Sequence, residues 1–327
     1  MTATAKDAPE RARTWTWVGE GPVAPIWVVL ALVIVAAALA SDRFLSPGNM
    51  VAVLQQGVIT GLVALGMTVV LIGGEFDLST GSTVMMAAVV ALLIGPAALT
   101  GAVAAVVVPL LLGAAIGLLN GLAVCCARAN SIVATIGMQF VVLGAVLALV
   151  DGQHVRAETI HPAFSALALW RPLGVPVPVI LFAVLVMLVA IVMSRTVLGR
   201  HIYAVGGDRD AAAKAGIRVA RVGIATFVLS GTLAALAGVI IAAMVGVIDP
   251  TAITRYELPA LTAAVLGGTS LTGGVGRPAD TAAAILIVSV ITNVMTLLNY
   301  QYAAQLMVHG VVLTGAVAFY SWQRGGR

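Results

Sequence analysis

The chain has 327 residues, of which 61% are hydrophobic and only 9% are charged, with a mean hydropathy of +1.10 and a formal net charge of +4. Soluble domains carry about 25% charged residues, so this composition excludes an ordinary soluble enzyme, a nucleic-acid-binding protein and a disordered scaffold. A helix that spans a membrane needs about 20 apolar residues, and about ten such helices would use most of the chain. No room remains for a separate soluble domain such as a nucleotide-binding module. We therefore expect an all-α, polytopic membrane protein.

Ten apolar runs follow a polar N-terminal tail that covers residues 1–22. The runs cover residues 23–40, 50–72, 79–95, 98–126, 132–150, 176–194, 222–247, 257–272, 281–298 and 303–320. The first run ends in an Ala-Leu-Ala sequence that resembles a signal-peptidase site, but it exceeds the usual apolar length of about 7–15 residues. We interpret it as an uncleaved span. The sequence thus predicts one transmembrane domain, residues 23–320, followed by a tail of residues 321–327.

The distribution of Lys and Arg indicates the orientation of these spans. With both chain ends in the cytoplasm and each run crossing once, 13 of the 17 Lys and Arg residues face the cytoplasm and four face outwards. The outward-facing ones are Arg43, Arg156, Arg171 and Arg255. Cytoplasmic loops of membrane proteins carry such an excess of positive charge. The runs at 79–95 and 257–272 are short and rich in Gly, Ser and Thr, yet omission of either would spoil this distribution.

The first motif, GGEFDLSTGS, begins with Gly73 and Gly74 and places a helix break and two carboxyl groups between two apolar runs. Backbone that leaves a helix at membrane depth has to be buried in protein or line a cavity. Asp77 or Ser79 could be the N-cap of the next helix, because both side chains can accept hydrogen bonds from backbone N–H groups. The alternative for Asp77 is a plain cap near the membrane interface. Glu75 is a candidate functional residue, because intramembrane carboxyl groups are costly to bury.

The second motif, VLGGTSLTGGVG, occupies residues 265–276 and repeats the order of the first: Gly-Gly, Leu, Ser or Thr, and Gly again. Its first pair, Gly267 and Gly268, lies 194 positions after the pair of the first motif, and Gly273 and Gly274 form a further pair. Glycine-interrupted hydrophobic segments in corresponding parts of two halves are typical of the broken helices of transporters. The alternative is close packing of helices through small residues.

The third motif lies in the predicted cytoplasmic loop of residues 195–221, which carries six Lys and Arg residues. Asp208 can N-cap a short helix from Arg209 to Ala215 that ends at Gly216. This helix is too short and too polar to cross a bilayer. We expect it to dock a cytoplasmic partner, and the alternative is a simple connector at the membrane surface.

Taken together, four stretches resemble the permease subunit of ATP-driven sugar importers of the ribose, xylose and galactoside type. These stretches are residues 73–82, GLLNG at 117–121 with IVATIG at 132–137, residues 199–217, and Tyr256-Glu257-Leu258 with residues 267–276. In order and spacing, the resemblance runs from about residue 45 to the C-terminus. Two departures, Phe76 in the first motif and Pro259 after Leu258, leave the subfamily and the sugar open.

The resemblance implies a transport subunit and not an enzyme. Permeases of this type are ten-helix proteins that pair as dimers in membrane lipid, with homodimers and heterodimers both known. Two cytoplasmic ATPase subunits bind their inner face, and an extracytoplasmic binding protein delivers a monosaccharide for import by alternating access. This chain would bind no cofactor, because ATP and Mg belong to the ATPase, and it would lie in the cytoplasmic (inner) membrane of a bacterium. The residues that would form the coupling helix, which contacts the ATPase, are Asp208, Arg209, Asp210, Ala211, Ala212 and Gly216.

Polar side chains within the spans are candidates for the passage, because neutral hydrogen-bonding groups suit a solute that is polar but uncharged. The alternative for each is a hydrogen bond between helices, which contributes about 0.6 kcal/mol on average. The pathway candidates are Gln55, Gln56, Glu75, Asp77, Ser79, Asn120, Thr135, Gln139 and Asn293.

Other functions leave different marks on a sequence. The alternative solutes are a nucleoside, an autoinducer-type sugar derivative and a branched-chain amino acid. An ion-coupled secondary carrier could use His309 as a proton relay, but the lack of other buried titratable groups argues against proton coupling. A membrane enzyme would need a cluster of acid, base or metal ligands, and His154 and His161 fit no metal motif. We interpret the adjacent Cys125 and Cys126 as small apolar fillers rather than a redox or metal pair, and we expect no metal site.

Overall fold

The computed structural model describes residues 24–250, 256–301 and parts of 303–315. The helices are α1 (Ala24–Ala40), α2 (Pro47–Ile72), α3 (Thr80–Leu93), α4 (Leu99–Cys125), α5 (Ser131–Val150), α6 (Pro162–Leu169), α7 (Val177–Arg195), α8 (Val197–Gly207), α9 (Arg209–Lys214), α10 (Val219–Val245), α11 (Glu257–Leu266) and α12 (Pro278–Leu297). Two short strands, β1 (Val155–Arg156) and β2 (Val247–Ile248), pair antiparallel, and a 3-10 turn covers Pro172–Gly174. The prediction of an all-α protein is confirmed.

Each of the first nine predicted apolar runs contains a helix, and the tenth is described only in part. Among the described residues, α2, α4, α5, α7, α10 and α12 are long and apolar enough to cross a membrane by length and composition. The shorter apolar helices are α1, α3, α11 and part of residues 303–312. The expected tails, residues 1–22 and 321–327, lie outside the described residues, as do Arg255 and His309. The polytopic architecture is therefore as expected, and the positions of the two tails stay predictions.

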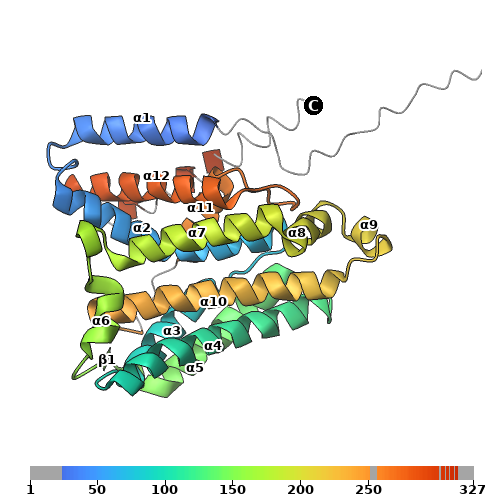
Figure 1. Ribbon diagram of the computed structural model, residues 1–327, viewed down its shortest axis with the longest axis horizontal. Helices are drawn as coiled ribbons and strands as arrows, with labels where there is room; N and C mark the ends of the chain where they lie inside the picture. Colours follow the sequence, from blue (N-terminus) through green and yellow to red (C-terminus); the bar gives the residue numbers. More distant parts are fainter. Residues whose placement is uncertain are drawn as a thin grey trace, which may run out of the picture.

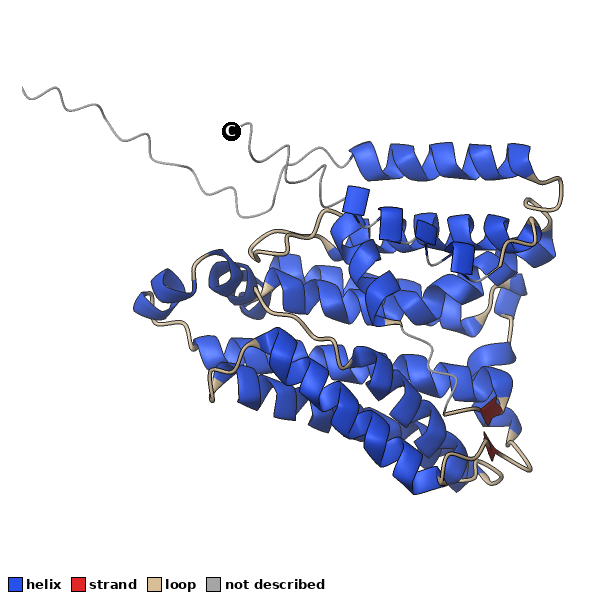
Figure 2. Cartoon of the chain, turned by 180° about the vertical axis from the view of Figure 1, so that it is seen from behind, coloured by secondary structure: helices blue, strands red, loops and turns tan. Residues whose placement is uncertain are grey.

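The long helices run side by side, so the bundle has two ends (Figure 1). α8 and α9 project from one end, and α6 and β1 lie at the other. Figure 2 shows the same arrangement from behind, with both strands at the end opposite α9. The basic loop of residues 195–221 and the loop of residues 151–175 thus lie at opposite ends, which agrees with the orientation inferred from the positive charges.

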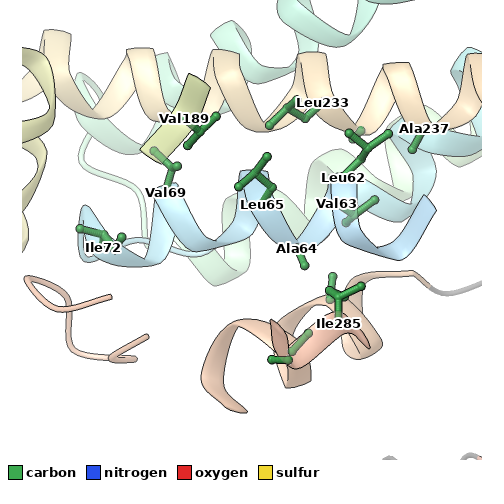
Figure 3. Close-up of a cluster of buried hydrophobic side chains, with 14 of the residues drawn as sticks. Leu62, Val63, Ala64, Leu65, Val69, Ile72, Val189, Leu233, Ala237 and Ile285 are labelled. Carbon is green, nitrogen blue, oxygen red and sulfur yellow. The ribbon is translucent and has the colours of Figure 1, made fainter. Parts of the chain in front are cut away.

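α2 forms the centre of the bundle, and its side chains pack on two opposite sides (Figure 3). Leu62 and Leu65 point toward Leu233 of α10, whereas Ala64 lies on the side of Ile285 of α12. The most apolar stretch of α2 is 83% buried, while the corresponding stretches of α5 and α7 are only 17% buried. A helix that is apolar all round belongs in a core or in lipid. α2 therefore occupies the core, and α5 and α7 present apolar faces to the membrane.

α3 and α11 are too short to cross a bilayer alone. They have 14 and 10 residues, which at 1.5 Å per residue gives roughly 21 and 15 Å, against a hydrocarbon core of about 30 Å. The run predicted over residues 257–272 is thus helical only as far as Leu266, where the Gly-Gly pair ends the helix. The rest of the path is irregular backbone, which the bundle has to enclose.

Five elements were not predicted, namely β1, α6, the 3-10 turn, α8 and β2. Only one short helix was expected in residues 195–221, but α8 precedes α9, and its N-cap is Thr196, whose side chain accepts a hydrogen bond from Gly199 N at 3.2 Å. Its Gly-rich end resembles a loop, although Ile202 and Val205 form a buried stripe at helical spacing. In the outer loop, α6 and β1 were missed because both are very short and depend on contacts with distant segments.

Candidate functional site

The first Gly-Gly pair ends α2 with a tight turn that redirects the chain. Gly73 keeps a helical conformation (φ −70°), and Gly74 is left-handed (φ +83°). The N–H of Gly74 donates to Leu71 O at 2.8 Å, and the N–H of Glu75 donates to Val70 O at 3.2 Å. This pair of bonds is a Schellman motif, which satisfies carbonyls that a helix end leaves free. We call residues 73–79, which lead from this turn to α3, the first elbow.

The second Gly-Gly pair makes the same turn at the end of α11. Gly267 is again helical (φ −71°), and Gly268 is again left-handed (φ +83°). Gly268 N donates to Val265 O at 2.8 Å, and Thr269 N donates to Ala264 O at 3.0 Å. Each of these residues stands 194 positions after its counterpart in the first turn. The similarity of the two motifs is therefore a repeated backbone structure, and we call residues 267–277 the second elbow.

The two elbows meet each other and α8 at a contact made almost entirely of backbone. Gly274 N donates a hydrogen bond to Ile72 O at 2.9 Å. A Cβ on Gly206 would lie 2.7 Å from Gly274 N, and a Cβ on Gly273 would lie 2.8 Å from Gly74 Cα. Only glycine allows backbones to approach this closely. We call this contact of Ile72, Gly74, Gly206, Gly273 and Gly274 the glycine junction; it brings together all three sequence motifs.

Two side-chain contacts connect the α8–α9 segment to the elbows. Arg209, the first residue of α9, donates from Nη1 to Glu75 Oε1 at 2.6 Å, and the two side chains are 45% and 14% exposed. Tyr203 of α8 donates from its hydroxyl to Gly276 O at 2.7 Å. Burial raises the pKa of Tyr203, so the hydroxyl stays protonated and remains a donor. One contact reaches the first elbow and the other reaches the second.

The short helix α9 has the ends that its sequence predicts. Asp208 Oδ1 accepts hydrogen bonds from Asp210 N at 3.0 Å and from Ala211 N at 2.9 Å, which is an N-cap. Gly216 follows the helix with φ +83°. Ala212 is the one α9 residue in the core, whereas Arg209, Asp210, Ala211, Ala213 and Lys214 are exposed. α9 therefore presents most of its surface away from the bundle (Figure 1).

A buried polar network holds the first elbow inside the bundle. Asp77, which is 1% exposed, accepts from Ser79 Oγ at 2.7 Å and from Ser230 Oγ of α10 at 2.8 Å. Asn120 of α4 donates from Nδ2 to Ser79 Oγ at 2.8 Å. Thr135 of α5 accepts from Leu78 N at 3.1 Å. These hydrogen bonds join the elbow to three helices, and buried polar groups need such partners.

Ser79 occupies the N-cap position of α3, as one of the two predicted alternatives. Its side chain makes no capping bond, however, because its hydroxyl is used by Asp77 and Asn120. Asp77 instead accepts from Ser79 N at 3.2 Å. The polar residues of this motif thus serve the elbow rather than the helix end.

The remaining pathway candidates do not lie in this network. Asn293 forms a reciprocal amide pair with Asn49 at 2.9 and 3.0 Å, which joins α12 to α2 as an interhelical contact. Gln139 of α5 donates to Glu257 Oε1 at 3.5 Å. Gln55 is half-buried and Gln56 is exposed, both in the first half of α2.

Glu257 is a buried carboxyl residue that was not among the pathway candidates. Its side chain opens α11, is 7% exposed, and faces the backbone of Gly81 in the first turn of α3. A carboxyl group at the start of an apolar run was the available signal. A cavity of 140 Å³ lies nearby, between α3, α10, β2 and the start of α11. It is lined by Gly81, Val84, Met85, Ala88, Ile241, Val247, Ile248, Asp249 and Tyr256.

The cysteines and histidines form no metal centre within the described part of the chain. No group of three or more His, Cys, Asp or Glu side chains there could hold a metal ion. Cys125 is buried with its sulfur against Gly223 of α10, Cys126 is exposed, and both are free thiols. His154 lies 3.8 Å from Asp249 at the outer end.

Known proteins match this chain over most of its length. The family described as "Branched-chain amino acid transport system / permease component" matches residues 49–317. The ribose import permease protein RbsC of Escherichia coli (strain K12) is 36% identical over 293 residues, which cover 89% of this chain and 91% of the relative. The RbsC protein of Bacillus subtilis (strain 168) is 34% identical, with 88% and 89% covered. The L-arabinose transport system permease protein AraH of Escherichia coli (strain K12) is 35% identical, with 89% and 88% covered. No solved structure matches the chain.

Proposed function

We propose, from the premise that the chain belongs to the family of branched-chain amino acid transport system permease components, that it is the permease subunit of an ATP-binding cassette importer for a monosaccharide. The chain is a multi-pass membrane transport component and not an enzyme. The observation that carries the choice of solute is the naming of its relatives, which are ribose and arabinose permeases matched over about nine-tenths of the chain. The family description names a branched-chain amino acid instead, which makes that solute the second candidate.

Partners of two kinds go with this family, an ATPase and a solute-binding protein. We place the ATPase on α9, because this short capped helix projects from the basic end of the bundle with most of its side chains exposed. ATP and Mg would bind to that partner. The binding protein would approach the opposite end, where α6 and the β1–β2 pair lie. We further propose that two copies of the chain form the complete transport unit.

We place the passage for the solute beside α3 and α11. Both helices are too short to span the membrane, and the contact between Gln139 and Glu257 lies where they approach each other, next to the cavity. Carboxyl and amide groups can hydrogen-bond to several hydroxyl groups of one sugar. Movement of α9 by the ATPase would alternately open this region to the two sides of the membrane.

Reconstituted uptake tests the proposal. The chain, its ATPase and its binding protein are placed in proteoliposomes, and ATP-dependent uptake of labelled ribose, arabinose and leucine is measured. We expect uptake of a pentose and none of leucine. Uptake of leucine alone would favour the second candidate, and uptake driven by an ion gradient without ATPase would contradict the proposal.

The role of α9 is tested with Gly216→Pro, because proline cannot adopt the left-handed conformation of Gly216. We expect that the ATPase no longer co-purifies with this variant and that uptake is lost, while the membrane bundle stays folded. Gly48→Ala is the control, since nothing lies within 4 Å of its added Cβ. Normal uptake by the Gly216→Pro variant would contradict the assignment of α9.

A further inference from the structure

We propose that Glu75 and Tyr203 are positioning residues that hold the α8–α9 segment to both elbows. Through these contacts, α9 moves as one rigid body with the end of α2, the start of α3 and the start of α12. The inference rests on the proposed function, because it assumes that an ATPase moves α9. It goes beyond that function by naming the contacts through which the movement reaches the transmembrane helices.

The contact of Glu75 reaches the first elbow where hydrogen bonds hold its backbone against neighbouring helices. Its carboxyl group receives the Arg209 guanidinium at 2.6 Å and is only 14% exposed. On its C-terminal side, Phe76 N donates to Ser131 Oγ at 3.2 Å, and Asp77 is held by Ser79 and Ser230. Because these bonds fix the elbow to α5 and α10, a displacement of Arg209 is passed to the start of α3.

The contact of Tyr203 reaches the second elbow just before α12. Its hydroxyl donates to Gly276 O at 2.7 Å, and α12 begins two residues later at Pro278. Tyr203 and Gly206 are three residues apart and therefore lie on one face of α8. Through this face α8 contacts both elbows, since Gly206 packs against Ile72 and Gly274 in the glycine junction.

The end of α2 and the second elbow are also joined directly. The hydrogen bond from Gly274 N to Ile72 O at 2.9 Å connects the last residue of α2 to the second elbow. Without Glu75 and Tyr203, the backbone contacts of the junction and the packing of Ala212 would remain, but the α8–α9 segment would lose its side-chain hydrogen bonds to the two elbows. We therefore expect the loss of both side-chain contacts to reduce coupling far more than folding, because the Arg209 side of the ion pair is 45% exposed and a solvent-exposed charge pair adds little to stability.

The functional test compares solute transported with ATP hydrolysed by the complete complex in proteoliposomes. The variants are Glu75→Gln, Tyr203→Phe and the double variant. The controls are Glu158→Gln and Tyr300→Phe, which change exposed residues outside the junction. We expect the double variant to transport about fivefold less solute per ATP, a typical coupling effect, with unchanged recovery of ATPase and an unfolding temperature near that of the unmodified complex. An unchanged ratio, or a loss that only follows the unfolding temperature, would overturn the proposal.

Charge exchange gives a second test of the same contact. Glu75→Arg and Arg209→Glu should each lower the transport ratio, and the combined variant should recover most of it because the ion pair is restored with reversed polarity. Failure of the combined variant to exceed both single variants would contradict a direct role for the pair.

A distance measurement separates this inference from the proposed function. Spin labels are attached at Ala213→Cys in α9 and at Val275→Cys in the second elbow, both exposed sites, in a chain that also carries Cys126→Ser. The distance between the two labels is measured with and without nucleotide. We expect the distance between the two labels within one copy to be narrow and unchanged by nucleotide, and to become a broad distribution in the double variant Glu75→Gln, Tyr203→Phe; mixing labelled with unlabelled chains isolates this distance from those between copies. A distance that changes with nucleotide in the otherwise unmodified chain would overturn the single-body proposal even if sugar uptake is normal. Failure of uptake in the unmodified complex would instead overturn the proposed function.

Discussion

The first elbow is stabilised by side chains, whereas the second is stabilised by glycines and backbone hydrogen bonds. In the first, Asp77 and Ser79 form a buried network with α4 and α10. In the second, Gly273, Gly274 and Gly276 all have positive φ values, of +86°, +71° and +157°. Both elbows nevertheless begin with the same Gly-Gly turn and the same Schellman bonds.

The difference between the two elbows follows from the parts of the bundle that surround each of them. The first leads into α3, which is buried along most of its length, so its polar backbone needs polar partners inside the bundle. The second lies against α8 and the first elbow, where chain segments have to approach closely. A Gly-Gly pair thus sets the turn, and the surroundings decide how the rest of the elbow is held.

The largest expected effect is in the glycine junction, with Gly206→Ala. A Cβ there would lie 2.7 Å from Gly274 N and would also collide with Ile72 O. Backbone atoms cannot move aside as a side chain can, so we expect a loss of about 3 kcal/mol or more of stability. The neighbouring variant Gly207→Ala is the control, because nothing lies within 4 Å of its Cβ. Thermal unfolding in detergent checks the pair, and similar unfolding temperatures would contradict the close contact.

Removal of the Asp77 carboxyl group should have the next largest effect. Asp77→Ala leaves Ser79 and Ser230 without their acceptor, and we expect a loss on the order of 3 kcal/mol from the unsatisfied buried groups. Asp77→Asn should cost only about 1 kcal/mol, because its amide can donate to Ser230 Oγ while its oxygen accepts from Ser79. Asp42→Asn, at an exposed site, is the control. Equal unfolding temperatures for the Ala and Asn variants would show that hydrogen bonding is not what the carboxyl group contributes.

Serine variants compare the two elbows directly. Ser79 Oγ donates to Asp77 and accepts from Asn120, which lies on another helix, whereas Ser270 Oγ bonds to Thr272 of its own elbow, with an Oγ–Oγ1 distance of 2.8 Å and a bond from Thr272 N at 3.2 Å. We expect Ser79→Ala to cost about 2 kcal/mol and Ser270→Ala about 1 kcal/mol. If Ser270→Ala is the more damaging in the same unfolding assay, the second elbow depends on side chains more than its geometry indicates.

The smallest contrast is predicted for the shared turn. Gly74→Ala and Gly268→Ala place an alanine at the same φ of +83°, which costs about 1–2 kcal/mol in each case. The added Cβ at Gly74 has ordinary room, with its nearest neighbour, Gly206 Cα, at 3.6 Å. We therefore expect equal losses of unfolding temperature at the two positions. A clear difference would show that the two turns are not equivalent in energy.

The apolar runs and the two turns could be predicted because each has a strong local signal. The first Gly-Gly pair ended α2 where expected and Asp208 capped α9 as expected, whereas the second pair ended α11 at Leu266, inside the run predicted over residues 257–272. The partners of the polar residues could not be predicted in the same way. Ser230 binds Asp77 from a helix far along the chain, and nothing near Asn293 in the sequence indicates its pairing with Asn49.

α8 and Glu257 show a second limit. α8 ends in Gly206 and Gly207, which favour a loop by propensity, and tertiary contact with both elbows overrides that preference. Glu257 was part of a recognised motif, but its position beside Gly81 depends on how deep α11 begins in the bundle. Depth is set by packing between helices, and no local pattern records it.

The buried network of the first elbow also bears on how the protein is made. Asp77 enters the membrane region early in synthesis, while its partner Ser230 is added 153 residues later. α10, which carries Ser230 and packs against α3 and α4, is therefore absent while the six predicted spans that precede it are made. During that interval the carboxyl group lacks one of its hydrogen-bond donors at a place where lipid cannot supply one. The hydrogen bonding of the first elbow is therefore complete only after α10 has joined the bundle.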